Sequence, residues 1–389
     1  MKRIVILTAT RAEYGILKPL IAGMTADSYY DARIAVTGMH LSPEFGMTVK
    51  EIETDGFSID RKIEILLSSD TPVALSKSMG LAMISFSEYF EERKPNALLV
   101  LGDRFETFAV CAAAVNARIP ILHLHGGEAT EGLIDEAFRH SVTKMSHLHF
   151  TSTQAYRKRV IQLGESPDRV FNVGALGVEN ALKMQTMTLD ELEECLGFKL
   201  GANYAVGSFH PVTLERLTAK RQTKELLDAV GRHRDITFLF TKANADTDGR
   251  IINKTLEAYA KAQDHLRLVD SLGSKRYLSA LKHAAFVIGN SSSGLIEAPS
   301  FHIPTINIGD RQRGRIAGET VIHCEPDAVS IDRAIQKAMN QGFRNRIEKA
   351  ANPYGDGHTL GKIMSIVKEF FENDKIDVKK KFHDIDFEA

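Results

Sequence analysis

A stretch of 24 residues, 121–144, concentrates side chains that can move protons: ILHLHGGEATEGLIDEAFRHSVTK contains three histidines, four carboxylates and a Gly-Gly pair. Carboxylates and imidazoles serve as acid and base near neutral pH when burial or neighbouring charges shift their pKa values. His125, Glu128 and Asp135 are therefore candidates for general acid–base catalysis. Asp103, in the earlier motif LGDRFET, is a fourth.

The same stretch also admits a purely structural interpretation. Asp135–Arg139 and Glu136–His140 are spaced i,i+4, so on an exposed helix they would form ion pairs that contribute only tenths of a kcal/mol. We favour this interpretation for Glu136 and His140. His123 lies within an apolar run, and we interpret it as a core histidine.

The elements that must position these side chains are short β-branched runs separated by amphipathic stretches. Such runs are typical of parallel strands covered on both faces. Strands are predicted at 3–8, 32–38, 97–103, 119–125, 147–152 and 169–174, and again at 204–210, 236–242, 266–271, 284–291, 303–309 and 320–324. Helices are predicted between them, among them 72–93, 105–117, 214–230 and 327–341.

This repeated βαβ pattern predicts an α/β protein with two Rossmann-like, doubly wound domains. The expected boundaries are 1–180 for the first domain, which carries the catalytic carboxylates, and 200–355 for the second. Residues 356–389 are expected to form a helix, which packs back on the first domain, followed by a mixed-charge, solvated tail.

Polar residues follow almost every predicted strand. In open parallel sheets, ligands bind beyond the carboxyl ends of the strands. Two facing sheets would place these residues around one cleft, and His40 and Arg104 among them are candidate substrate ligands. The clusters are Thr8–Arg11, Gly38–His40, Gly102–Arg104, His123–Glu128, His210, Lys242–Asn244, Gly289–Ser293 and Gly309–Arg315.

Two of these clusters suit a diphosphate. In VIGNSSSGLIEA (287–298), serine hydroxyls precede a predicted helix that carries Glu297, and a helix start attracts anions. A plain serine cap is the alternative. The next cluster, GDRQRGR (309–315), has three arginines that can face phosphate oxygens or form surface ion pairs.

Bulk composition narrows the class of protein. With 49 Lys+Arg against 50 Asp+Glu, the net charge is −1, so no basic field indicates nucleic acid. The three cysteines have neither metal-ligand nor disulfide spacing, and no metal site is expected. The first apolar run is too short for a signal peptide or a membrane span, so we expect a cytoplasmic protein with no membrane partner.

Taken in order, the motifs TATRAEYG, GMHLSPEFG, GDRFE, HGGE, FHPVT, GNSSSGLIEAP and GDRQRGR resemble the hydrolysing UDP-N-acetylglucosamine 2-epimerases over residues 3–365. The resemblance implies a glycosyltransferase-B-type architecture and a UDP-sugar substrate, with neither metal nor nicotinamide cofactor. It also implies a homodimer or homotetramer, and a role in sialic or legionaminic acid (nonulosonate) biosynthesis.

The resemblance also assigns site residues. Asp103 and Asp135 match catalytic carboxylates. The matches to nucleotide-binding positions are Arg11, His210, Asn244, Ser291, Ser292, Glu297 and one arginine of GDRQRGR, for which we favour Arg313.

One position departs from the family. Members that make the sialic-acid precursor have I-E-G-G-E where this chain has Leu124-His125-Gly126-Gly127-Glu128. A related branch acts on UDP-N,N′-diacetylbacillosamine. The sequence leaves open which of the two UDP-sugars is the substrate and which group moves which proton. A non-hydrolysing epimerase, a glycosyltransferase and a nucleotide-sugar sensor are the alternatives.

Overall fold

The computed structural model describes residues 1–69, 71–215, 217–243 and 248–386. The chain divides into two compact units, which we describe separately. Unit 1 comprises residues 1–128, 135–179 and 354–389, and unit 2 comprises residues 129–134 and 180–353. The six residues between Glu128 and Asp135 thus belong to unit 2, although unit 1 holds the chain on either side of them.

Unit 1 is built on a seven-stranded sheet of order β3-β2-β1-β4-β5-β6-β7, in which all neighbouring strands are parallel. Its strands are β1 Lys2–Thr8, β2 Tyr30–Thr37, β3 Ile59–Ile63, β4 Ala97–Leu101, β5 Ile121–Leu124, β6 Leu148–Thr151 and β7 Val170–Asn172. Its helices are α1 Arg11–Ala26, α2 Val49–Thr54, α3 Pro72–Arg93, α4 Phe105–Asn116, α5 Asp135–Met145, α6 Gln154–Gln162 and α15 Thr359–Glu372, together with the first half of α7 Leu176–Lys183.

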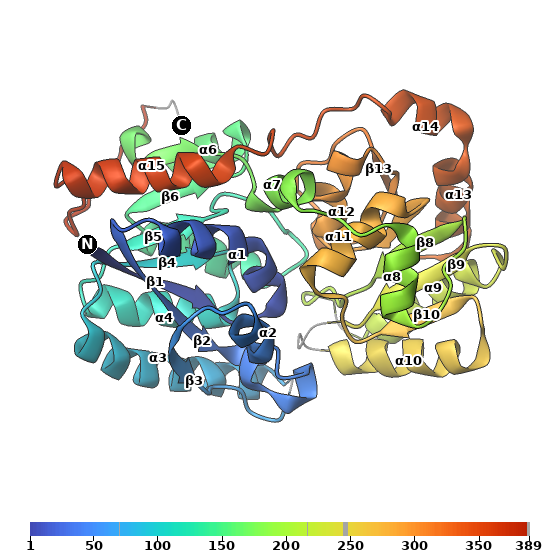
Figure 1. Cartoon of the computed structure of the whole chain (residues 1–389), viewed down its shortest axis with the longest axis horizontal. Coiled ribbons are helices and arrows are strands. Elements are labelled where there is room, and N and C mark those ends of the chain that lie inside the picture. Colours follow the sequence, from blue (N-terminus) through green and yellow to red (C-terminus); the bar gives the residue numbers. More distant parts are fainter. Residues whose placement is uncertain (70, 216, 244–247, 387–389) are drawn as a thin grey trace. The chain divides into compact units, whose positions relative to one another are not determined.

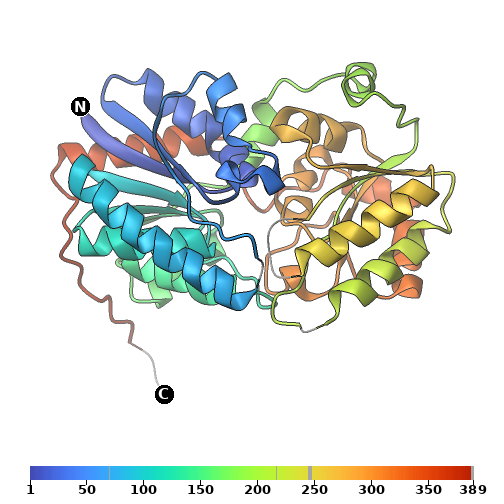
Figure 2. The same ribbon diagram turned by 90° about the horizontal axis from the view of Figure 1, so that it is seen from below.

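Both faces of this sheet are covered by apolar side chains from helices. On one face the strands pack against α3, α4 and Val142 of α5, and Figure 2 shows α3 and α4 side by side. On the other face they pack against α1 and α15, which contributes Ile363, Val367 and Phe370. Figure 1 shows this last helix, in red, among the elements of unit 1.

Unit 2 repeats the plan with a six-stranded parallel sheet of order β10-β9-β8-β11-β12-β13. Its strands are β8 Tyr204–Ser208, β9 Thr237–Thr241, β10 Leu266–Val269, β11 Phe286–Gly289, β12 Thr305–Ile308 and β13 Val321–Cys324. Its helices are α8 Leu189–Leu196, α9 Ala219–Val230, α10 Gly249–Ala262, α11 Gly273–His283, α12 Ser293–Ile296, α13 Ala328–Met339 and α14 Gln341–Ile347.

The predicted fold class is confirmed: each unit is a doubly wound parallel α/β sheet with helices on both faces. One strand escaped prediction. β3 has the sequence IDRKI, and only its last residue is buried. It lies at the edge of the sheet, so it lacks the continuous apolar run by which the interior strands are recognised.

Candidate functional site

The candidate acid–base groups of unit 1 lie where β4 and β5 end and α5 begins. Asp103 follows β4, His125 follows β5, and Asp135 is the first residue of α5. Parallel neighbours β4 and β5 bring the first two to the same edge of the sheet. The placement therefore matches the position that ligands occupy in folds of this kind.

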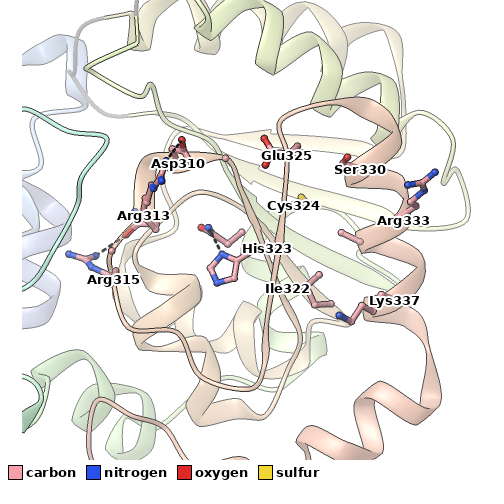
Figure 3. A pocket seen from close by; sticks show the side chains of 15 residues that line it. Asp310, Arg313, Arg315, Ile322, His323, Cys324, Glu325, Ser330, Arg333 and Lys337 are labelled. Atoms are coloured by element: carbon pink, nitrogen blue, oxygen red, sulfur yellow. Dashed lines mark hydrogen bonds and ion pairs between the residues drawn. The ribbon is translucent and has the colours of Figure 1, made fainter. Parts of the chain in front are cut away.

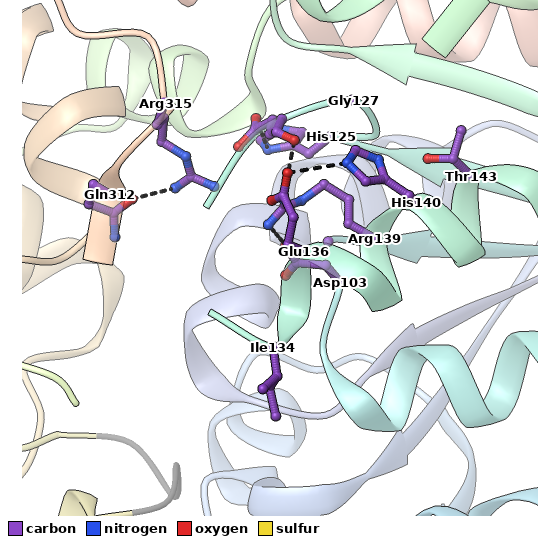
Figure 4. Close-up of polar contacts among 12 residues, drawn as sticks. Asp103, His125, Gly127, Ile134, Glu136, Arg139, His140, Thr143, Gln312 and Arg315 are labelled. Carbon is purple, nitrogen blue, oxygen red and sulfur yellow. Dashed lines mark hydrogen bonds and ion pairs between the residues drawn. The ribbon is translucent and has the colours of Figure 1, made fainter. Parts of the chain in front are cut away.

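A buried arginine joins Asp103 to Glu136, the residue that follows Asp135. The side chain of Arg139, on α5, is only 1% exposed and forms ion pairs with Asp103 and Glu136. It also donates to the backbone oxygen of Glu128 at 3.0 Å. Figure 4 shows Glu136 between Arg139 and His140. The guanidinium thus fixes groups from the β4 loop, the β5 loop and α5 in one cluster.

The sequence left the surroundings of Arg139 open, and the structure buries it against Asp103 and Glu136. Arg139 lies three residues before the buried Val142, so it shares the inward face of α5. A charged side chain there needs partners, and Asp103 and Glu136 provide them. The pairing of Glu136 with His140 is confirmed, with 3.2 Å between Oε1 and Nε2. The i,i+3 spacing from Arg139 to Val142 was the signal that could have placed Arg139 in the site.

His125 and Glu128 form a second contact, around the glycine turn. His125 has the left-handed φ of 66°, which histidine tolerates better than most residues. Its Nδ1 lies 3.3 Å from Oε1 of Glu128. The same carboxylate oxygen accepts a hydrogen bond of 2.7 Å from Ser152, a residue that no motif or spacing in the sequence singles out. His125 can therefore exchange a proton with a carboxylate that is itself held in place.

His123 is a core histidine, as predicted. It is fully buried, with Nε2 2.9 Å from the backbone oxygen of Gly102 and Nδ1 3.4 Å from the hydroxyl of Thr143. Burial lowers its pKa to about 3, so the ring is neutral at physiological pH. It therefore supports the backbone immediately before Asp103.

The other candidates of unit 1 surround the ends of β1 and β2. Arg11 is the first residue of α1, after the cap Thr10. His40 is fully buried, with its ring nitrogens 2.9 Å from Thr8 and 2.8 Å from Thr48, and burial lowers its pKa to about 4. Arg104 donates to Glu106 at 3.2 Å. His40 thus supports the strand ends from inside, whereas Arg11 and Arg104 are partly exposed.

Glu13 is an unusual buried carboxylate beneath this region. Its Oε2 accepts the backbone N–H groups of Ala9 (2.9 Å) and Thr10 (3.1 Å), which completes a capping box. Burial and the charge of Glu106 raise its pKa from 4.5 to about 7, although Arg104 and the two N–H groups oppose the shift. In the folded protein the acid is therefore mostly protonated below about pH 7 and mostly ionised above it.

This shift predicts a pH-dependent stability. A raised carboxyl pKa contributes stability that is fully present below about pH 4.5 and is lost as pH rises through about 7. In Glu13→Gln the amide oxygen can still accept both N–H groups, and the amide does not ionise. We therefore expect the free energy of unfolding of the variant, relative to that of the parent, to rise by up to about 3 kcal/mol between low pH and pH above 8. Urea unfolding at pH 5.5 and 8.5 measures this, with the exposed Glu88→Gln as control. Equal pH dependence in all three proteins would contradict it.

In unit 2, three strand ends meet at Asn290. The side chain of Asn290 exchanges two hydrogen bonds of 2.8 Å with the backbone of His210. Its backbone oxygen accepts hydrogen bonds from the side chains of Arg311 (3.1 Å) and Gln312 (2.8 Å). Gly289 permits the approach, because a Cβ there would lie 1.9 Å from the backbone oxygen of Ser208. The loops after β8, β11 and β12 are thus one rigid group.

The serines follow this junction directly. Ser291 and Ser292 are partly exposed, and Ser292 is the N-cap of α12. The expected helix is a single turn, Ser293–Ile296, and Glu297 lies at its end rather than within it. A dipole needs several aligned peptide units, so hydroxyl groups and neighbouring arginines are better placed than the helix to bind an anion here.

The arginines of 309–315 differ in their surroundings. Arg311 is held against Asn290, next to the serines. Arg313 is 65% exposed and lies 3.4 Å from both Glu131 and Asp310. The backbone N–H of Glu131 also donates to the oxygen of Arg313 at 3.0 Å. Residues 129–134, which connect Glu128 to Asp135 in the sequence, are therefore tied to the arginine loop.

A cavity of about 710 Å³ lies beside this loop, between β12, β13 and α13. Figure 3 shows His323 at its centre, hydrogen-bonded to Asn307 at 3.2 Å, whereas the charged ends of Arg315 and Arg333 point away from it. The charged side chains around this cavity do not converge on one point.

The predicted site residues therefore fall into two groups. Unit 1 holds Arg11, His40, Asp103, Arg104, His125, Glu128 and Asp135, and unit 2 holds His210, Ser291, Ser292, Glu297 and Arg313. Asn244 lies outside the described residues. In the described ranges, no three histidine, cysteine or carboxylate side chains are grouped to hold a metal ion, and no helix has the length and apolarity to cross a membrane.

Two doubly wound units with polar clusters at their strand ends define a protein of the glycosyltransferase-B-like class. The fold of a Neisseria meningitidis UDP-GlcNAc 2-epimerase, solved bound to UDP-GlcNAc, matches with a TM-score of 0.80 at 19% identity, covering 95% of this chain and all of the other. Residues 23–368 match the family described as UDP-N-acetylglucosamine 2-epimerase, and the chain belongs to that family of enzymes.

Two curated relatives are closer in sequence. The "GDP/UDP-N,N′-diacetylbacillosamine 2-epimerase (hydrolyzing)" of Campylobacter jejuni is 43% identical over 88% of this chain and 89% of its own length. The "Polysialic acid biosynthesis protein P7" of Escherichia coli is 40% identical over 99% and 98%. The resemblance inferred from the motifs is thus confirmed at the level of the family.

Proposed function

We propose that this enzyme is a hydrolysing 2-epimerase that converts a UDP-2-acetamido sugar to UDP and the free sugar inverted at C2. The observation that carries the proposal is the 43% identity, over most of both chains, to the hydrolysing C. jejuni enzyme. Because that relative is named for GDP/UDP-N,N′-diacetylbacillosamine, we propose UDP-N,N′-diacetylbacillosamine as the substrate, with UDP-N-acetylglucosamine as the second candidate.

In this proposal, unit 2 binds the UDP moiety. The hydroxyls of Ser291 and Ser292 and the guanidinium of Arg311 would donate to the diphosphate, and Glu297 would accept from the ribose hydroxyls. Arg313 would exchange its contacts with Glu131 and Asp310 for phosphate oxygens. His210, Asn244 and, from unit 1, Arg11 complete the predicted set of nucleotide ligands.

Unit 1 would supply the groups that move protons. The C2 hydrogen of the sugar is not acidic while no carbonyl lies beside it, so departure of UDP comes first. Donors on the diphosphate stabilise the charge of the leaving group, and C1 becomes oxocarbenium-like. A base then removes the C2 proton to leave a glycal. Water adds at C1 while an acid returns a proton to the opposite face of C2.

The contacts of unit 1 support this division of labour. Asp103 is held by Arg139 and remains 22% exposed, so its carboxylate can reach a ligand without losing its orientation. His125 and Glu128 are in contact, and this pair can relay a proton where other members have a glutamate. The hydrogen bond from Glu131 to Arg313 lies within unit 2 and ties the segment that follows Glu128 to the arginine loop.

The decisive experiment is incubation with each UDP-sugar in D2O, followed by NMR of the products. We expect free sugar with manno-type configuration, one deuterium at C2 and an equal amount of UDP. A product that retains UDP would indicate a non-hydrolysing epimerase, and turnover only with an added acceptor would indicate a glycosyltransferase. A free sugar without deuterium at C2 would rule out the proposed elimination.

Comparing the two sugars under the same conditions tests the substrate assignment. We expect kcat/KM to be at least tenfold higher for UDP-N,N′-diacetylbacillosamine. A preference for UDP-N-acetylglucosamine would overturn the assignment of the sugar while leaving the reaction type intact. The name of the E. coli relative supports a role in nonulosonate synthesis; this role, the cytoplasmic location and the homo-oligomeric state stay predictions.

A further inference from the structure

The segment that follows α15 is anchored by one lysine. The expectation of a solvated tail is wrong for Lys380, whose side chain is only 18% exposed. Its ammonium donates to the backbone oxygens of Lys144 (2.6 Å) and Ser146 (2.8 Å) and to Oε1 of Glu165 (2.9 Å). An ammonium has three donors, and here all three are used.

These two backbone oxygens belong to the end of α5. Lys144 is in its last turn, and Ser146 follows its last residue, Met145. The last carbonyls of a helix have no partner within the helix, and a cation there also complements the negative end of the dipole. Lys380 therefore caps α5 from a position 235 residues further along the chain than Met145.

The third partner, Glu165, is a buried carboxylate built to receive cations. Its side chain is 1% exposed and lies 2.6 Å from Nζ of Lys144 and 3.1 Å from Nε2 of His149. Burial opposes its ionisation, but hydrogen bonds from His149, Lys144 and Lys380 lower its pKa to about 2. Removing the positive charge of Lys380 would leave the negative charge of the buried Glu165 only partly compensated.

The residues that follow Lys380 also pack against unit 1, at Lys144 and Gly164. The ring of Phe382 packs against Gly164, where a Cβ would lie 2.2 Å from the ring, and Nζ of Lys144 lies 4.8 Å from the centroid of that ring. The N–H of His383 donates to the oxygen of Gly164 at 2.9 Å. Lys379 and Lys381, on either side, are exposed.

We propose that Lys380 is a positioning residue for the reaction, because it fixes the C-terminal end of α5, the helix that begins at Asp135 and carries Arg139 near its middle. This inference rests on the proposed function for its kinetic part. A helix of 11 residues is roughly 16 Å long and moves as a rod, so movement at its C-terminus is transmitted to the carboxylate cluster. Substrate itself does not touch Lys380 in this account.

Buried polar groups give the anchor a second connection to the site. His149, which binds Glu165, is the register partner of His123 in the β5–β6 pair. His123 in turn contacts the backbone oxygen of Gly102, immediately before Asp103, and Thr143 on α5. The contacts of Lys380 and the backbone before Asp103 are therefore both supported by strands β5 and β6 and by helix α5.

The test compares Lys380→Met with Lys379→Met and Lys381→Met, which remove the same charge from exposed positions. Hydrogen–deuterium exchange of residues 135–146 reports on the helix without any substrate. We expect exchange roughly three- to tenfold faster in Lys380→Met alone, the equivalent of one lost cap and its hydrogen bonds. Unchanged exchange of α5 would overturn the proposal, even if the protein showed no epimerase activity.

Kinetics then separate positioning from general damage. We expect kcat of Lys380→Met to fall roughly three- to tenfold, with KM and UDP affinity within twofold of the parent, and Lys380→Arg to recover most of the loss. Faster exchange with an unchanged kcat would overturn the proposal. So would a parallel loss of UDP affinity, because that would indicate a global effect. Should Lys380→Met fail to fold, Lys380→Gln provides the same comparison with an amide donor in place.

Discussion

Replacing Asp103 or Asp135 by asparagine is expected to lower turnover by roughly 10²- to 10⁴-fold, while UDP binds with nearly parental affinity. Losses of this size are typical when a proton-transfer group is removed. Asparagine keeps the size of the side chain and can still accept a hydrogen bond from Arg139 at position 103. Neither substitution alters a predicted nucleotide ligand, because these are Arg11 in unit 1 and residues of unit 2.

The measurement pairs steady-state UDP release with calorimetric titration of UDP. Asp168→Asn is the matched control, because Asp168 is exposed in the same unit and outside the carboxylate cluster. Near-normal turnover in both Asp103→Asn and Asp135→Asn would show that the catalytic assignment is wrong. Loss of UDP affinity in step with turnover would instead indicate binding roles.

The two variants can also assign the two proton transfers. A variant that lacks the base for the C2 proton should release UDP slowly. A variant that lacks the acid for the return step should release UDP and accumulate the glycal, which NMR detects. Repeating the experiment with His125→Glu, which introduces the glutamate that the family resemblance implies at this position, shows whether the histidine has taken over either step.

The sheets could be predicted from the sequence because interior parallel strands need apolar residues on both faces. This pattern located twelve of the strands, and with them the loops that carry the candidate residues. β3 was missed because an edge strand with the sequence IDRKI satisfies no such requirement. Helix α3 was predicted at its observed bounds, and the structure shows Pro72 in its first turn and Lys94 as its C-cap.

The contacts that organise the site could not be predicted in the same way. The roles of Arg139 and Lys380 depend on partners 36 and 215 residues away, Asp103 and Glu165. Periodicity records which face of an element a residue occupies, and it carries no information on which distant charge meets that face. A lysine in the run KKK therefore resembles its exposed neighbours until the chain is folded.

Arg139→Met is expected to have the second large effect, on both stability and turnover. The substitution leaves the carboxylates of Asp103 and Glu136 without their shared buried cation, which typically costs about 3–5 kcal/mol of folding free energy. Turnover should fall at least 100-fold, because Asp103 loses the contact that orients it. Urea unfolding and UDP release measure the two effects, with Arg221→Met, an exposed arginine on α9, as control.

Arg139→Lys separates charge from geometry. A lysine can neutralise the two carboxylates, but it lacks the planar fork that reaches Asp103, Glu136 and the backbone of Glu128 together. We expect Arg139→Lys to recover most of the stability and little of the turnover. Full recovery of turnover would mean that charge alone is sufficient. Unchanged turnover in Arg139→Met would show that the cluster around Arg139 serves the fold and that Asp103 is oriented by other contacts.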